Sequence, residues 1–403
     1  MKILVINAGS SSLKYQLIDM DNEQMVCKGN CERIGMPGGI FTHKTADGRE
    51  LKKNVNMLDH AAAFMQVKNA LIDGEYGVIN SLDEVAAVGH RIVQGGSIFH
   101  ESVLVDEKVI EDIESLIPLA PLHNKAHSQG IRACREVFGE QVPEVVVFDT
   151  AFHATMPPKA YMFNVPYEYY EKYAVRRYGF HGTSHRYVTL RAAELLGKDP
   201  KDLKIVSCHL GNGSSLAAVD GGKCVDTSMG LTPLAGLPMG TRAGDMDVGV
   251  IEYVANKYDR SISSVMEGLN KRSGMMGLSG VSSDFRDLEA AAAKGHHRSA
   301  IALRIFEYRV HKMIAEYAAA MNGVDVVVFT AGVGENAPST RAHILEGLDF
   351  MGITCDEEKN NTRGEERIIS KDGAPVTVMV IPTNEELMIA QDTLSIVEEN
   401  KNK

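Results

Sequence analysis

The chain has 403 residues, of which 24% are charged, and its formal net charge is −11 at pH 7. This length favours two domains, and the acidic balance argues against broad binding to nucleic acid or to an acidic membrane. The six cysteines include no C-x-x-C pair, and no apolar run approaches the roughly 20 residues that span a bilayer. We therefore expect a cytoplasmic protein without a zinc site, a disulfide framework, a signal peptide or a membrane segment.

The first predicted element is a β-hairpin. The strand-like residues 2–6 run into a turn over residues 7–14 (NAGSSSLK), and a second apolar stretch follows from Tyr15 to Ile18. Such a turn can gather backbone N–H groups, hydroxyls and a cation around a phosphate, or it can be a plain serine-rich loop. It lacks the spacing of a Walker loop and leads into a strand rather than a helix.

Two further segments of the first half combine glycine with basic residues. In residues 89–96 (GHRIVQGG), Arg91 follows a strand-like run and can offer a planar fork to a carboxylate or phosphate, with a surface salt bridge as the alternative. In residues 177–185 (RYGFHGTSH), His181 can donate a hydrogen bond to a phosphoryl oxygen. Its spacing to His185 also permits a metal pair on a helix, but Gly182 and the lack of an acidic third ligand argue against one. A helix is predicted over 186–196.

The chain contains an internal echo. Residues 2–13 (KILVINAGSSSL) resemble residues 204–216 (KIVSCHLGNGSSL), and residues 144–149 (EVVVFD) resemble residues 325–330 (DVVVFT). Because both echoes occur in the same order, we expect a duplicated βββαβ-type half, and hence two mixed-sheet domains that face a cleft, where ligands usually bind.

Later segments offer further candidate contacts. Arg242, in the loop 238–247, can present its guanidinium to a transferred phosphoryl group, or it can pair with Asp245 or Asp247 in a rigid turn. Residues 282–286 and 330–336 look like nucleotide-contact loops, although Asp284 can also be a simple helix N-cap and the second segment a plain βα loop.

Two more helices are predicted towards the C-terminus. One runs over residues 299–321 and ends at Asn322-Gly323. Another begins near Thr383, where Thr383-x-x-Glu386 fits a capping box.

With these segments assembled, the chain resembles the acetate kinase family, within the superfamily of acetate and sugar kinases, heat-shock chaperones and actin. The resemblance covers essentially the whole length. It is carried by residues 7–14, 148–153 (FDTAFH), 178–185, 209–213 (HLGNG) and 239–242 (MGTR).

The resemblance implies an α/β, duplicated two-domain fold of the actin-like and ribonuclease H-like kind, with mixed sheets and an interdomain cleft. Residues 1–150, completed by a C-terminal helix over 384–403, would form the acyl and phosphate side, and residues 151–383 the nucleotide-binding domain. It also implies reversible phosphoryl transfer from ATP to acetate, giving acetyl phosphate and ADP, by a homodimer that needs Mg²⁺ or Mn²⁺.

The resemblance further implies roles for individual residues. Asn7 and Glu385 would hold the metal, with Lys14 near the nucleotide phosphates. Asp149 is the family's proposed acid/base residue, and His181 and Arg242 are its transition-state stabilisers.

Two sets of binding residues complete the implied site. Arg91 would bind the acyl carboxylate, and the methyl group would meet an apolar pocket of Val93, Leu122, Phe180 and Pro233. The ATP site would be lined by His209, Leu210, Gly211, Asn212, Gly213, Asp284, Phe285, Arg286, Gly332, Val333, Gly334, Glu335 and Asn336.

The chain departs from the family pattern at Gln94, usually His, and at Lys125 and Val248, each usually Pro. Because Gln94 lies beside the implied acyl pocket, a propionate or butyrate kinase with the same site residues is the nearest alternative, and a non-metabolic ATPase of the superfamily is a more distant one. Acetate is already ionised at pH 7, so we expect Asp149 to organise metal-bound water or Arg91 rather than to remove a proton.

Overall fold

The computed structural model describes residues 1–121 and 123–401, and Leu122 of the implied acyl pocket lies outside them. The chain divides into two compact units: unit 1 is Met1–Ala151 with Asn384–Lys403, and unit 2 is Phe152–Thr383. It therefore passes from one unit to the other twice, after Ala151 and after Thr383. Within the described ranges, no helix is long and apolar enough to cross a membrane.

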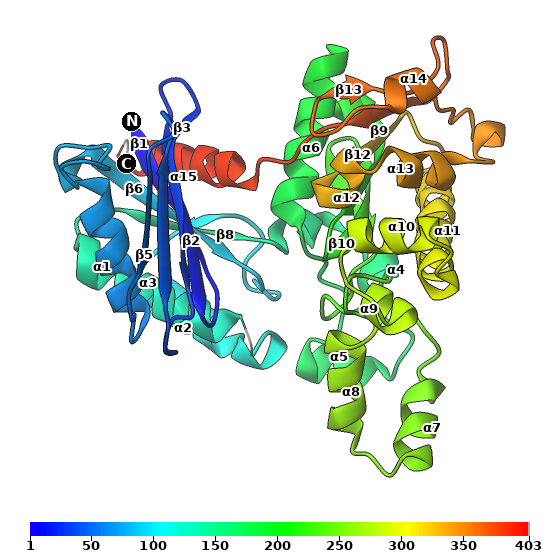
Figure 1. Cartoon of the computed structure of the whole chain (residues 1–403), viewed down its shortest axis with the longest axis horizontal. Helices are drawn as coiled ribbons and strands as arrows, with labels where there is room; N and C mark the ends of the chain where they lie inside the picture. The colour runs from blue at the N-terminus through cyan, green and yellow to red at the C-terminus, as the bar shows by residue number, and fades with distance from the viewer. Residues whose placement is uncertain (122, 402–403) are drawn as a thin grey trace. The chain divides into compact units, whose positions relative to one another are not determined.

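Unit 1 is built on an eight-stranded mixed sheet in the order β5-β4-β3-β2-β1-β6-β8-β7 (Figure 1). The strands from β5 to β1 are antiparallel neighbours, β6 and β8 run parallel to β1, and β7 closes the edge antiparallel to β8. The strands are β1 Lys2–Ala8, β2 Ser12–Asp19, β3 Gln24–Glu32, β4 Ile40–Thr45, β5 Glu50–Asn54, β6 Val85–Ile92, β7 Val103–Leu104 and β8 Glu144–Phe148.

Helices cover both faces of this sheet because β1 alternates its apolar side chains between them. Leu4 and Ile6 pack with α1 and α3 on one face, whereas Ile3 and Val5 pack with α15 on the other. The helices are α1 His60–Leu71, α2 Glu107–Ser115, α3 Asn124–Phe138 and α15 Glu385–Lys401, with short 3₁₀ turns η1 Leu82–Glu84 and η2 Ile117–Leu119. The C-terminal helix thus completes the core of the N-terminal unit.

Unit 2 is built on a six-stranded mixed sheet in the order β11-β10-β9-β12-β14-β13. Its strands are β9 Lys204–Leu210, β10 Ser214–Asp220, β11 Lys223–Thr227, β12 Val326–Thr330, β13 Arg367–Ile368 and β14 Thr377–Val380. Its helices are α4 Pro158–Tyr161, α5 Tyr167–Tyr173, α6 Gly182–Leu196, α7 Gly249–Lys257, α8 Ile262–Lys271, α9 Gly274–Ser279, α10 Phe285–Ala293, α11 His297–Ala320, α12 Ala331–Asn336, α13 Pro338–Leu345 and α14 Glu357–Asn360. The 3₁₀ turns are η3 Ala151–Thr155, η4 Pro200–Asp202 and η5 Asp349–Met351.

The two sheets repeat one strand pattern. In each, an antiparallel hairpin (β1–β2 or β9–β10) is extended on one side by another antiparallel strand and on the other by two parallel strands. The duplication is therefore confirmed, but the second sequence echo was misaligned. β12 pairs directly with β9 as β6 does with β1, so the counterpart of β12 is β6, whereas β8 corresponds to β14. Valine-rich buried strands look alike in sequence whichever neighbour they pair with.

Three predicted helix ends need comment. α6 ends before Gly197 as expected but begins at Gly182, four residues before the predicted start. α11 begins two residues before the predicted start and ends at Ala320, one residue early, with Met321 as its C-cap; Asn322 follows with a φ of 54°, the left-handed conformation expected there. The capping box at Thr383 was wrong: the side chain of Asn384 accepts the N–H of Leu387, and the Thr383 hydroxyl bonds to Ser184 instead.

Candidate active site

The charged groups of unit 1 gather where its parallel strands end. β1, β6 and β8 run in the same direction, so their carboxyl ends meet at one edge of the sheet. Asn7 lies at this end of β1, Arg91 at this end of β6, and Asp149 directly follows β8. Glu385, the first residue of α15, brings a second carboxylate to the same group.

Arg91 is held by Asp149 in a two-bonded fork. Its Nε and Nη2 atoms donate to the two Asp149 carboxylate oxygens at 2.9 and 2.7 Å, and its Nε lies 3.8 Å from Oε2 of Glu385. The Arg91 side chain is 21% exposed and that of Asp149 only 2%, so the surface salt bridge is ruled out. Burial works against the charge on Arg91, but the carboxylates of Asp149 and Glu385 outweigh it and raise the pKa of Arg91.

Glu385 has an unusual proton affinity. Burial raises its pKa to about 7, and Asp149 and Glu386 add to the rise, while Arg91 opposes it. A carboxylate that is half protonated near neutrality is poorly compensated by the groups around it. It would gain from a further cation.

The first hairpin is tighter than predicted. β1 and β2 extend inward until Asn7 and Lys14 stand directly opposite each other as cross-strand partners, so the turn is reduced to residues 9–11. The Gly9 N–H donates to the Ser12 carbonyl at 2.8 Å, and Nε2 of His60 lies 2.8 Å from the Gly9 carbonyl oxygen. Asn7 and the exposed Lys14 are therefore presented from strands rather than from a mobile loop.

The residues implied in the acyl pocket are divided between the units. Val93 is buried in unit 1, where its N–H donates to Nε2 of His127 at 3.3 Å. Phe180 and Pro233 belong to unit 2, and the Phe180 ring is buried there. Gln94 is fully buried, and its side-chain oxygen accepts the N–H of Gly96, so it stabilises its own loop.

In unit 2, the three predicted nucleotide segments converge on one cavity of about 440 Å³. They come from the β9–β10 turn, the start of α10 and the helix α12. The cavity is lined by Gly211, Asn212, Ser283, Asp284, Phe285, Arg286, Glu289, Gly332, Val333, Asn336, Ala337 and Arg363. The lining mixes apolar side chains with a few polar groups, as small-molecule sites generally do.

Two of the three segments differ locally from a simple contact loop. Asp284 is both the N-cap of α10 and the ion-pair partner of Arg286, whose hydrogen bond lowers the Asp284 pKa. Residues 331–336 form the short helix α12 rather than a loop, entered through Ala331 at a φ of 63°. Helix propensity could not reveal this turn, because it holds two glycines.

Some of the residues predicted to contact the nucleotide do not line the cavity. A carboxylate oxygen of Glu335 accepts the N–H of Thr383 at 3.1 Å, and Nδ1 of His209 lies 2.8 Å from Oγ of Ser184. Neither residue is among those that line the cavity. Leu210 is fully buried in the apolar core of unit 2.

His181 and Arg242 approach the same glycine of the β9–β10 turn. A Cβ atom placed on Gly213 would lie 2.8 Å from Nη2 of Arg242 and 3.4 Å from Nε2 of His181. The His181 ring stacks on His209 with centroids 4.1 Å apart, and the His181 backbone has a left-handed φ of 57°. A side chain at position 213 would therefore push the Arg242 guanidinium out of this position.

The predicted pairing of Arg242 with Asp245 or Asp247 was wrong. Arg242 donates from Nη1 to the Pro233 carbonyl at 2.6 Å. Asp245 instead accepts the N–H of Gly236, and Asp247 accepts that of Gly249. Burial lowers the pKa of Arg242. The guanidinium is thus anchored by a neutral carbonyl, and its charge is left for a ligand.

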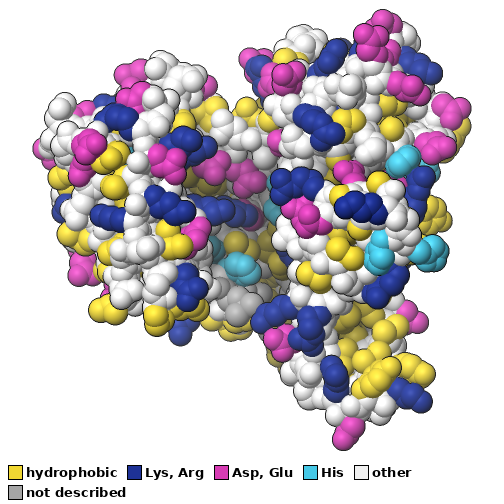
Figure 2. Space-filling view, viewed as in Figure 1, with side chains coloured by type: hydrophobic (Ala, Val, Ile, Leu, Met, Phe, Trp, Pro, Cys, Tyr) yellow, Lys and Arg dark blue, Asp and Glu magenta, His cyan; other side chains and the backbone are white. Residues whose placement is uncertain are grey.

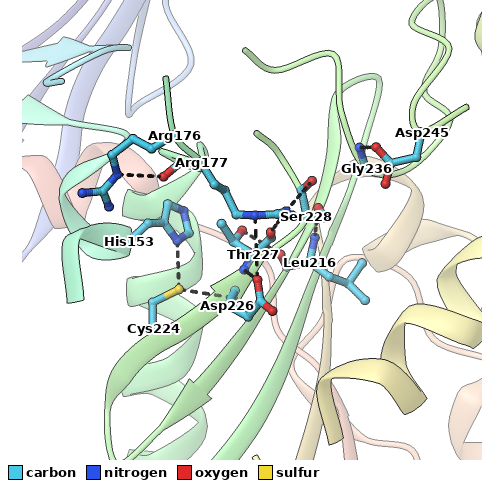
Figure 3. Close-up of polar contacts among 10 residues, drawn as sticks. All are labelled: His153, Arg176, Arg177, Leu216, Cys224, Asp226, Thr227, Ser228, Gly236 and Asp245. Atoms are coloured by element: carbon cyan, nitrogen blue, oxygen red, sulfur yellow. Dashed lines mark hydrogen bonds and ion pairs between the residues drawn. The ribbon is translucent and has the colours of Figure 1, made fainter. Parts of the chain in front are cut away.

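Figure 3 shows the polar contacts that support this part of unit 2. Arg177 donates to the carbonyls of Thr227, the last residue of β11, and of Ser228, which follows it. Asp245 accepts the N–H of Gly236 at 2.7 Å. On the other side, Nδ1 of His153 lies 3.1 Å from Sγ of Cys224. These contacts hold the segments before His181 and Arg242 against the sheet.

Sequence reasoning missed several residues that line this cavity. Glu289 lies one turn along α10 from Arg286, so helical spacing could have indicated it. Arg363 comes from an irregular segment and gave no signal; its Nη1 donates to the Asn336 carbonyl. Behind it, the fully buried Arg341 donates to the carbonyls of Gly334, Asn360 and Thr362, and burial lowers its pKa to about 10.

Among the described residues, one His/Cys/Asp/Glu group has metal-like spacing: His90, Cys134 and Glu144, all buried in unit 1. Nε2 of His90 lies 2.8 Å from Oε2 of Glu144, and burial raises the pKa of the Cys134 thiol well above its usual value. A hydrogen-bonded pair beside a neutral thiol accounts for this group without a metal.

Two α/β units with the same strand pattern, each ending its central strands in charged or glycine-rich segments, define a duplicated protein of the actin-like class. The family model described as the acetokinase family matches residues 2–391. The chain belongs to the acetokinase family.

Individual relatives cover the whole chain. An acetate kinase of Thermoanaerobacter pseudethanolicus is 56% identical over 398 residues, which are 98% of this chain and 99% of that protein. The crystal structure of Porphyromonas gingivalis acetate kinase matches with a TM-score of 0.96 at 45% identity, covering 98% of this chain and 99% of that one. A propionate kinase from Francisella tularensis matches with a TM-score of 0.91 at 40% identity and the same coverage.

Proposed function

We propose that this chain is an ATP:acetate phosphotransferase, which transfers the γ-phosphoryl group of ATP directly and reversibly to acetate, giving acetyl phosphate and ADP. The observation that carries the proposal is the Arg91 fork, fixed by Asp149 beside Glu385 in a chain whose full length matches acetate kinases. A fixed, planar guanidinium is suited to a small carboxylate.

Charge is the main obstacle to this reaction, because both reactants are anions in a protein of net charge −11. Transfer of a phosphoryl group depends on positioning and on neutralising its equatorial oxygens. We assign the carboxylate to Arg91 and the nucleoside to the cavity of unit 2. We assign binding of the phosphoryl oxygens to Arg242 and His181, which both approach Gly213, with Lys14 as a further cation.

We assign the Mg²⁺ site, which Mn²⁺ could share, to Asn7 and Glu385. An amide oxygen and a carboxylate are the hard ligands that these ions prefer, and the raised Glu385 pKa is that of a carboxylate short of positive charge. Once bound, the ion would neutralise charge on the nucleotide phosphates. The residues of the chain would orient the acetate and the phosphoryl group.

We propose that Asp149 acts by holding Arg91 in place. Asp149→Asn removes one of the two charge-assisted bonds, so the KM for acetate should rise. If excess Mg²⁺ restores no activity and the pH–rate profile loses an ionisation, proton transfer by Asp149 is the better account.

A propionate-preferring enzyme is the second candidate, favoured by the match to the Francisella tularensis propionate kinase. One methylene in an apolar pocket is worth only about 1–3 kcal/mol, so overlapping activity is expected. An ATP-dependent hydroxamate assay with acetate, propionate and butyrate separates the candidates by kcat/KM. Acetate should give the highest value; ATP hydrolysis without a trapped acyl phosphate would contradict both candidates.

We further propose that the chain works as a homodimer in the cytoplasm. Unit 2 exposes large apolar side chains on α7, α8 and the segment between them, among them Tyr253, Tyr258 and Ile262, each at least 65% exposed. Figure 2 shows hydrophobic side chains over this region. The six cysteines, all within the described ranges, are unpaired thiols, as a reducing compartment requires. Sedimentation analysis should give about twice the chain mass.

A further inference from the structure

A chain of buried hydrogen bonds runs behind His181 in unit 2. Oγ of Ser215 lies 2.9 Å from Nδ1 of His181 and 2.8 Å from Nε2 of His185. On the far side of the His185 ring, Nδ1 lies 2.8 Å from Oγ of Ser207. Ser207 is on β9, His185 on α6 and Ser215 on β10, and all three are fully buried. Three elements thus meet behind one nitrogen of His181.

Few proton arrangements are open to this chain. His185 is neutral, because burial, together with repulsion from His153 and His209, holds its pKa well below the usual value. A neutral imidazole carries one N–H and one bare nitrogen. His185 therefore donates either from Nδ1 to Ser207 or from Nε2 to Ser215.

Counting hydroxyl protons selects between the two. If Nδ1 of His185 donated to Ser207, the Ser207 hydroxyl proton would need another acceptor, and His185 is its one side-chain partner among the residues that the structure describes. A buried proton without an acceptor is costly. If Nε2 donates instead, Ser207 donates to His185, His185 to Ser215, and Ser215 to His181, so every proton has an acceptor.

We propose that Ser207, His185 and Ser215 are positioning residues that keep His181 neutral with its proton on Nε2. Because Ser215 donates to Nδ1, the one N–H of the His181 ring is at Nε2, the atom 3.4 Å from a Cβ placed on Gly213. If His181 were an imidazolium, its Nδ1 would donate to Ser215, and every hydrogen bond back to Ser207 would reverse its direction. The Ser207 hydroxyl proton would then have no acceptor.

The catalytic consequence of this tautomer rests on the proposed function. At the phosphoryl group, His181 is then a neutral hydrogen-bond donor, and Arg242, also directed at Gly213, supplies the positive charge. The arrangement keeps an acidic proton away from the nucleotide. It also gives His185, four residues after His181, a role other than that of a metal ligand.

The protonation of the rings can be measured directly on the full-length, ligand-free protein with ¹⁵N-labelled histidine. Long-range ¹H–¹⁵N spectra distinguish the two neutral tautomers and the cation, and His181→Gln and His185→Gln variants assign the signals. At pH 7.5 both rings should be neutral with the proton on Nε2. A cationic His181, or a proton on its Nδ1, overturns the inference whether or not the enzyme transfers phosphate to acetate.

Kinetics test the positioning role. Ser207→Ala removes the first donor of the chain, and we expect kcat to fall about tenfold with both KM values nearly unchanged. Ser207→Thr, which keeps the hydroxyl, should recover most of kcat. The matched control is Thr189→Val on α6, because the buried Thr189 hydroxyl donates to the backbone carbonyl of His185 rather than to its ring.

The control separates positioning from structure. Thr189→Val should lower Tm about as much as Ser207→Ala while leaving kcat nearly unchanged. Equal losses of Tm with no change of kcat in either variant would overturn the positioning role. Absence of acetate-dependent phosphoryl transfer in the parent protein would instead contradict the proposed function and leave the tautomer result standing.

Discussion

Arg91 has two carboxylates within reach and little water around it, and this combination makes it a testable anchor. We expect Arg91→Ala and Arg242→Ala each to lower kcat/KM by about 10²–10³, because each removes a fixed cation from a partly buried site. The control is Arg132→Ala in unit 1: that side chain is 44% exposed, and its ion-pair partners within the described part of the chain are the surface carboxylates of Glu107 and Glu114, so activity should not change. Near-parent turnover by either site variant would refute the site assignment.

Glu385 allows a prediction about stability rather than rate. Its pKa in the folded protein is about 7, against 4.5 when unperturbed, so folding favours its protonated form. Its contribution to the free energy of unfolding is therefore fully present below pH 4.5 and is lost as the pH rises through 7. Because glutamine stays neutral, Glu385→Gln should be more stable than the parent at pH 8, by a few kcal/mol at most.

This prediction is checked by urea unfolding of ligand-free parent and variant at pH 5 and pH 8. The stability difference should shrink towards pH 5, where the Glu385 side chain is mostly protonated in the parent too. An equal difference at both pH values would mean that the substitution acts through packing and not through the charge.

At the scale of single elements, the positions of the candidate site segments were easier to predict from sequence than their local form. The residues of 282–286 and 330–336 themselves suggested nucleotide-contact loops, the second through its two glycines, which suit backbone approach to a ligand. The segment at 209–213 was assigned to the ATP site only through the family resemblance. Two features were wrong: the first turn was drawn too wide, and α12 was taken for a loop. Tertiary packing decided both, and no local propensity records it.

Contacts between distant segments were beyond sequence reasoning. The chain of hydrogen bonds from Ser207 to His181 joins residues of β9, α6 and β10. The spacing of these residues in the sequence does not indicate which hydroxyl contacts which ring nitrogen. The same holds for Arg242, whose carbonyl partner is Pro233 rather than the nearby aspartates. Residue type indicated the chemistry, whereas the fold alone selected the partners.

Arg363 allows a prediction about nucleotide binding in the cavity of unit 2. It lines the cavity and donates to the carbonyl that ends α12. Arg363→Ala should therefore raise the KM for ATP several-fold, in line with about 1 kcal/mol for one such contact, and leave the KM for acetate unchanged. Arg367→Ala on the nearby β13 is the control, since Arg367 does not line the cavity. A rise in the KM for acetate alone would contradict the assignment.

For the molecule as a whole, duplication explains how an acidic chain can handle two anions. Each unit holds a separate small group: Arg91 with its carboxylates in unit 1, and His181 with Arg242, which both approach Gly213, in unit 2. The duplication was visible in the sequence because both hairpins keep the pattern of a strand, a glycine–serine turn and a strand. The pairing of later strands was not visible, since it depends on crossover connections.

The division of labour between the units can be tested by hydrogen exchange on the full-length protein. ADP alone, at about 100 times its Kd, stabilises the conformation that it binds by about 2.7 kcal/mol. Amide exchange should therefore slow in those segments whose local unfolding would release the bound ADP. We expect new protection in residues 209–213, at the start of α10 and in α12, all in unit 2. Strands β3 to β5 of unit 1 line no part of the cavity and should exchange as before. Protection confined to β3–β5 would place the nucleotide on unit 1 and refute the assignment of the nucleotide to the cavity of unit 2.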